Sequence, residues 1–78
     1  MIFTVEIKDV DKALLGMAEV EIYLDQQGLQ DLLTQLGFLK SHGDHMHLFT
    51  ECWGGCPLTE VKQGRSNVLI HHLRITYL

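Results

Sequence analysis

Histidine is the residue type with the widest chemistry in this 78-residue chain, which contains five of them. His45 and His47 are separated by one residue, so their side chains share one face if the segment is a β-strand. His72 lies in a second strand-like segment and reaches that face if the two strands are neighbours. Three converging imidazoles are a candidate zinc site if each nitrogen approaches the metal to about 2.0–2.1 Å. The alternative is a set of exposed histidines that hydrogen-bond one another and nearby acids. The lack of a metalloprotease helix motif or a Cys-x-x-Cys pair favours this second interpretation.

The cysteines and serines lack the sequence context of a catalytic site. Three residues rather than two separate Cys52 from Cys56, and no helix start follows them, so we expect reduced thiols without a redox role. Ser41 and Ser66 lie in loop-like segments, and the chain has neither a Gly-x-Ser-x-Gly elbow nor a glycine-rich phosphate loop. We therefore predict no catalytic residue, no metal and no cofactor.

Trp53 is the strongest candidate for a binding residue. It precedes Gly54 and Gly55 in a loop, where a tryptophan either closes the open end of a thin core or stands exposed as an anchor for a partner. The sequence leaves both alternatives open.

Alternating and helical patterns define the elements that position these residues. Apolar side chains alternate at 3–8 and 18–24, which predicts an antiparallel hairpin whose connection, residues 9–16, contains a short helical turn. Asp25 is a candidate N-cap for a helix that ends at Leu36, before Gly37. The apolar stripe of this helix consists of Leu29, Leu32, Leu33 and Leu36.

The second half of the chain is predicted to form strands and loops. Residues 45–50 form a third strand, with His45, His47 and Phe49 on one face. Residues 58–61 form a short edge strand within a loop, and residues 67–78 form the longest strand.

These elements predict a single α+β domain over residues 1–78, in the order β-β-α-β-β. We expect one antiparallel sheet of four strands, or five with the edge strand, and one amphipathic helix across one face. The other face then stays open and carries several acids and imidazoles, among them Glu6. The predicted partner-binding residues are Glu19, Glu21, Tyr23, His45, His47, Trp53, His72 and Arg74.

Composition narrows the classes of partner. No apolar run approaches the roughly 20 residues of a membrane span, and the N-terminus does not resemble a signal peptide, so we expect a cytoplasmic protein. The net charge is −4, and residues 1–31 hold seven of the ten acids. This charge disfavours a nucleic acid and favours a protein partner, a basic one above all.

A family resemblance follows from motifs in the second half. His45-Met-His47-Leu48, Trp53-Gly54-Gly55 and His72-Leu73-Arg74-Ile75 occur in an order that resembles the Immunity protein 32 family of bacterial polymorphic toxin systems. The first half is similar in outline, so the likeness spans nearly the whole chain. The resemblance implies a small α+β protein that protects its producer cell by binding and neutralising a cognate toxin.

The leading hypothesis is therefore a non-catalytic immunity protein. One alternative is a metal-dependent enzyme or metal sensor built on His45, His47 and His72. Another is a homo-oligomeric structural module, such as a homodimer, because an exposed sheet can pair with its twin and enlarge a thin core.

Overall fold

A computed structural model describes all of residues 1–78, and its N-terminal half forms the predicted hairpin. Strand β1 (Phe3–Lys8) pairs antiparallel with β2 (Glu19–Leu24), and the 3₁₀ turn η1 (Val10–Leu15) connects them. Strand β5 (Val68–Ile70) pairs antiparallel with the other edge of β1, which gives a three-stranded sheet in the order β2-β1-β5. The hairpin and its helical turn are confirmed.

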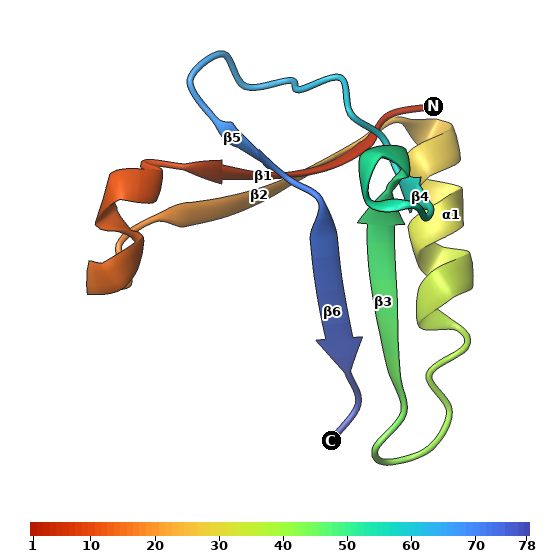
Figure 1. Cartoon of the computed structure of the whole chain (residues 1–78). Coiled ribbons are helices and arrows are strands. Elements are labelled where there is room, and N and C mark those ends of the chain that lie inside the picture. Colours follow the sequence, from red (N-terminus) through yellow and green to blue (C-terminus); the bar gives the residue numbers. More distant parts are fainter.

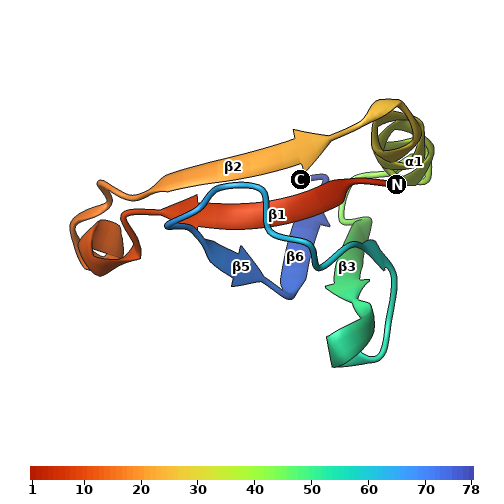
Figure 2. The ribbon, with the colours of Figure 1, turned by 90° about the horizontal axis from the view of Figure 1, so that it is seen from above.

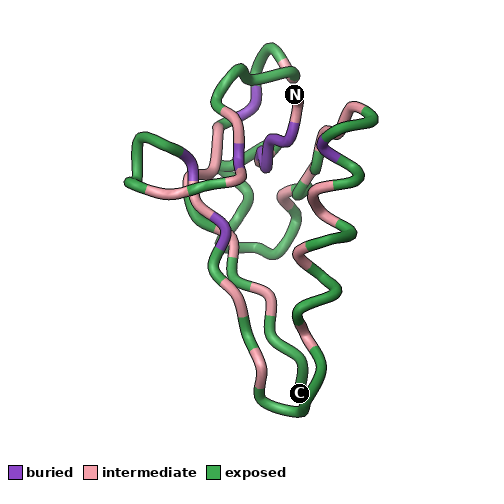
Figure 3. The backbone as a smooth tube through the Cα atoms, turned by 90° about the vertical axis from the view of Figure 1, so that its right-hand side faces the viewer, coloured by how far each residue is buried: buried purple, intermediate pink, exposed green.

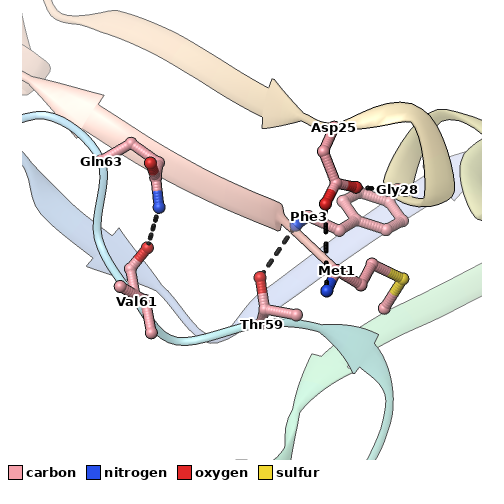
Figure 4. Close-up of polar contacts among 7 residues, drawn as sticks. All are labelled: Met1, Phe3, Asp25, Gly28, Thr59, Val61 and Gln63. Carbon is pink, nitrogen blue, oxygen red and sulfur yellow. Dashed lines mark hydrogen bonds and ion pairs between the residues drawn. The ribbon is translucent and has the colours of Figure 1, made fainter.

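Helix α1 (Gln26–Leu36) begins and ends where the sequence predicts. The Asp25 carboxylate accepts a hydrogen bond of 2.8 Å from the Gly28 amide, so Asp25 is the N-cap (Figure 4). Gly28 is buried because the first helical turn rests on the backbone of Ile2: a Cβ at Gly28 would lie 1.9 Å from the Ile2 carbonyl oxygen. This close approach explains a glycine in a first turn, where helix propensity alone disfavours it by about 1 kcal/mol.

A second sheet contains the C-terminal elements. Strand β3 (His45–Thr50) lies between β4 (Pro57–Leu58), to which it is parallel, and β6 (His72–Thr76), to which it is antiparallel. The 3₁₀ turn η2 (Glu51–Trp53) follows β3 directly. In Figure 1, β3, β6 and α1 run in roughly the same direction and the β1–β2 hairpin extends away from them, while Figure 2 shows α1 set apart from the two strands, at the end of β2.

The prediction of one sheet with four or five strands is wrong, although the α+β class is confirmed. The predicted long strand at 67–78 bends at His71, so that β5 joins the first sheet and β6 joins the second. Thr50 stabilises this bend: its amide donates to the His71 carbonyl at 3.0 Å, and its buried hydroxyl lies 2.6 Å from His71 Nδ1. The core-facing apolar positions change phase across the bend, from Val68 and Ile70 to Leu73 and Ile75, and the prediction of one continuous strand overlooked this change.

The core is small and lies where the two sheets meet. Its fully buried apolar residues are Phe3, Val5, Leu48 and Leu58. Thr59 ties the sheets together at this point, because its hydroxyl accepts from the Phe3 amide at 2.8 Å and its amide donates to the Phe3 carbonyl at 2.7 Å (Figure 4). Figure 3 shows how few segments of the chain are buried.

Helix α1 packs more loosely than its leucine stripe predicts. Only Leu32 packs against the core, whereas the other three leucines are exposed, Leu33 to 54%. The reason is the split of the sheet, which leaves α1 beside the narrow second sheet instead of across a wide one (Figure 3).

The polar side of β1 is covered, which contradicts the prediction that Glu6 lies on an open face. The Glu6 side chain is fully buried and accepts hydrogen bonds of 2.6–2.9 Å from four donors in the structure. These donors are the Thr4 hydroxyl, the amides of Gln63 and Gly64, and the Asn67 side chain. Glu6 thus holds the 63–67 segment against β1. Among the helices, none has the length and apolar character that a bilayer crossing requires.

Candidate functional site

The candidate site is the exposed face of the second sheet, which we call the histidine face. Alternation along β3 and β6 points Leu48, Leu73 and Ile75 toward the core and sends the neighbouring side chains outward. The register places His47 opposite Arg74 and Phe49 opposite His72. The histidine face consists of His45, His47, Phe49, His72 and Arg74.

The imidazoles of this face contact one another, as predicted for strand-borne histidines. His47 Nδ1 and His72 Nε2 lie 2.6 Å apart, a hydrogen bond in which one ring donates and the other accepts. His45 packs edge-on against His47 with ring centroids 5.3 Å apart, and Phe49 stacks on His72 at 4.5 Å. Desolvation, followed by the nearby His72, His45 and Arg74, lowers the pKa of His47 below its ordinary value of 6.5. The His47 ring therefore favours its neutral form, which can accept as well as donate.

Trp53 extends the histidine face beyond the end of β3. Its side chain is 60% exposed, so it does not plug the core, and its ring lies nearly parallel to His71 with centroids 6.5 Å apart. It also lies 6.2 Å from the His72 ring. The Trp53 loop packs directly on Phe49, since a Cβ at Gly55 would lie only 2.7 Å from the Phe49 Cβ. Glycine at this position is therefore what seats Trp53 next to the imidazoles.

Metal binding by His45, His47 and His72 has little geometric support. Two nitrogens bound to one tetrahedral zinc at about 2.0–2.1 Å lie about 3.3 Å apart. The separation between His47 and His72 is shorter, at 2.6 Å, and fits a direct hydrogen bond. In the whole structure, no group of three or more His, Cys, Asp or Glu side chains is arranged to hold a metal ion.

The two cysteines flank Trp53 without forming a bond. Cys52 and Cys56 are both free and exposed. The Cys52 amide donates to the Glu60 carboxylate at 2.7 Å, which helps to order the start of the loop. The two cysteines therefore lie on either side of Trp53 in the loop.

The acidic part of the predicted site lies on the other sheet. Glu19, Glu21 and Tyr23 are on β2, which belongs to the sheet of β1 and β5, so they do not share a face with the histidines. This corrects the prediction of one continuous binding face. The Tyr23 hydroxyl donates to Glu21 at 3.0 Å, and the Asn67 amide donates to the same oxygen at 2.8 Å. A hydrogen bond with Glu21 raises the pKa of Glu19, and the same bond lowers the pKa of Glu21.

The prediction of the site missed one residue that the sequence indicated. Phe49 stacks on His72, and Gly55 packs against the Phe49 side chain. Phe49 therefore connects the strands to the Trp53 loop. The alternation in β3 already put Phe49 on the same face as His45 and His47. The structure therefore brings together five of the eight predicted residues, namely His45, His47, Trp53, His72 and Arg74.

The histidine face offers groups that stack, hydrogen-bond and form ion pairs. Its groups are aromatic rings and imidazoles that stack and hydrogen-bond, with one permanent cation at Arg74. No pocket occurs in the structure. No known protein family, characterised protein or solved structure matches the chain in the three comparisons made.

Proposed function

We propose that this chain is a non-catalytic immunity protein that binds and neutralises a cognate bacterial toxin domain in the cytoplasm of the producing cell. The observation that carries the proposal is the exposed Trp53 ring, which is held beside an exposed layer of imidazoles. The motif resemblance supplies the class of partner, and the geometry supplies the surface.

The residue composition of the histidine face is typical of a hot spot in a protein–protein interface. Tryptophan and arginine are the residue types most enriched among hot spots, and aromatic surface is enriched at the centre of interfaces. Trp53 and Arg74 lie on the two sides of the His47–His72 pair, so a partner that covers one of them also covers the imidazoles. Neutral imidazoles lose less hydration than charged groups when they are covered.

The ring contacts also fix this surface before binding. His47 is hydrogen-bonded to His72, and His72 is in contact with both Phe49 and Trp53. Side chains that are already ordered lose less conformational entropy in a complex, where each mobile side chain costs about 0.5–1.5 kcal/mol. The interlocked rings therefore favour tight binding by a small area.

Charge indicates the complement that a toxin would need. Arg74 is the permanent charge of the histidine face and calls for a carboxylate or carbonyl opposite it. The whole chain carries a net charge of −4, which would steer a basic toxin domain toward it over a longer range. Glu19 and Glu21 contribute to that field from the other sheet and need not touch the toxin.

The test is a growth assay with the toxin domain. If the proposal holds, the gene for this chain adjoins one for a large secreted toxin, and co-expression with the toxin's C-terminal domain restores growth. Trp53→Ala and Arg74→Ala are each expected to weaken binding by at least about 30-fold, the effect of a hot-spot residue worth 2 kcal/mol. The double variant should lose protection.

Matched controls separate lost binding from lost folding. Gln30→Ala changes an exposed position on α1, away from the histidine face, and should protect as well as the unchanged chain. Because Trp53 is exposed, its alanine variant should keep the thermal midpoint of the unchanged chain within a few degrees. Full protection by the folded double variant would refute the proposed surface.

A further inference from the structure

The apolar face of the first sheet is covered at one end and bare at the other. The register aligns Phe3 with Leu24 and Val5 with Ile70, and these residues lie at or near the core, whereas Ile22 on the other side of Val5 is exposed. Farther along, Ile7 is aligned with Val20 and Val68. At this far end Val20 is 62% exposed, and Ile22 and Val68 are exposed as well. We call Ile7, Val20, Ile22 and Val68 the bare patch.

The bare patch continues into the tip of the hairpin. The 3₁₀ turn η1 exposes Leu14 completely and Leu15 to 73%, and Met17, the residue after its cap, is 68% exposed. Figure 1 shows this tip far from β3, β6 and α1, so nothing in the same chain packs against it. Contiguous apolar surface of this kind is rare on proteins that work alone and marks an interface.

The chain exposes more surface than a compact monomer of its mass would expose. A folded monomer of 8.9 kDa exposes about 4800 Å² according to the scaling of surface with mass. This chain exposes 5461 Å². The excess of roughly 650 Å² approaches the 800 Å² or so that each partner buries in a standard interface.

We infer that the bare patch is the interface of a homodimer, in which a second copy of this chain packs its own bare patch against the first. A second copy is the occupant because it is present whenever the chain is made, whereas a toxin is not. The patch itself carries no charged residue, and interfaces between permanent partners are the more hydrophobic class. Such a face is also complementary to itself, as a two-fold interface requires.

The acidic side chains of β2 indicate which surfaces of the two copies meet. The outer edge of β2 is unpaired in the structure, so a copy could in principle add its own β2 there. In an antiparallel pairing centred on Val20, Glu19 of one copy would lie opposite Glu21 of the other, and like charges on neighbouring strands destabilise a sheet. The two copies therefore pack face to face through the bare patch, and both histidine faces stay free.

Sedimentation equilibrium of the full chain without toxin tests the inference. The unchanged chain should sediment with twice its monomer mass of 8.9 kDa at micromolar concentrations, and its thermal midpoint should rise with concentration. Val20→Glu puts two buried charges into the dimer and should raise the dissociation constant at least 100-fold. The thermal midpoint of the unchanged chain provides a readout that does not depend on any variant being folded.

Leu33→Glu is the matched control, because it places the same charge on an exposed apolar position of α1. It should leave the dimer intact. A monomer at all micromolar concentrations, or dissociation by Leu33→Glu but not by Val20→Glu, would overturn the inference. These outcomes concern the chain alone, so they leave the test of toxin binding independent.

Discussion

Glu6→Ala should lower the free energy of unfolding by about 3–5 kcal/mol, because it deletes the acceptor of a buried hydrogen-bond network. The substitution leaves the Thr4 hydroxyl, the amides of Gln63 and Gly64 and one donor of Asn67 without their partner. It also releases the 63–67 segment from β1. Urea denaturation followed by circular dichroism measures the change.

Glu6→Gln provides the control of equal size. Its side chain keeps one acceptor oxygen but turns a donor toward the donors of the loop, so we expect a loss of about half that of alanine. If alanine cost less than about 1 kcal/mol, the network would not be what holds the loop on the sheet.

The same carboxylate predicts how stability depends on pH. Burial raises the pKa of Glu6, but the hydrogen bonds from Thr4, Gln63, Asn67 and Gly64 outweigh burial and lower the pKa from 4.5 to about 2. Because the pKa is lower in the folded state, the contribution of Glu6 is complete above pH 4.5 and disappears as the pH falls toward 2. The change in pKa corresponds to about 3 kcal/mol. Glu6→Gln should show a correspondingly smaller loss in acid.

Gly28→Ala is expected to destabilise the chain by about 3 kcal/mol, although alanine is the better helix former. The new Cβ would lie 1.9 Å from the Ile2 carbonyl oxygen, so either α1 or the start of β1 must move. That movement would also strain the hydrogen bond of 3.1 Å between the Asp25 amide and the same carbonyl. Thermal denaturation measures the effect, and the midpoint should fall by well over 10 °C for a domain of this size.

Gln27→Ala is the matched control in the same helical turn. Its side chain is exposed, so the substitution should change stability by less than about 0.5 kcal/mol. A Gly28→Ala variant as stable as this control would show that the helix does not rest on Ile2.

Local patterns predicted the elements well, and the assembly of those elements less well. The strands at Phe3–Lys8 and His45–Thr50, the Asp25 cap and the helix end at Leu36 follow from side-chain alternation and end signals, which neighbouring residues determine. The bend at His71 is held by hydrogen bonds to Thr50, 21 positions away in the chain, and its one local sign is the change of phase between Ile70 and Leu73. One unrecognised bend was enough to turn a single sheet into two.

The candidate site shows the same difference between what local patterns predict and what depends on the assembly of the elements. His45 and His47 are separated by one residue of the same strand, so their side chains share a face. His72 lies on that face as well because β3 and β6 are neighbours. Glu19, Glu21 and Tyr23 were assigned to that face only through the single sheet, so they were separated when it split. The alternation in β1 predicts a solvated side chain at Glu6. It does not reveal the hydrogen-bond partners Gln63, Gly64 and Asn67, because they are distant in sequence.

The most direct measurement of the central claim is amide hydrogen exchange of the chain with and without the toxin domain from its own gene cluster. The proposal predicts slower exchange in β3, β6 and the Trp53 loop when the toxin is bound, and unchanged exchange at Val20 and Ile22, which lie on the other sheet. Protection confined to β2 and the hairpin tip, or none in any segment, would contradict a toxin-binding role for the histidine face.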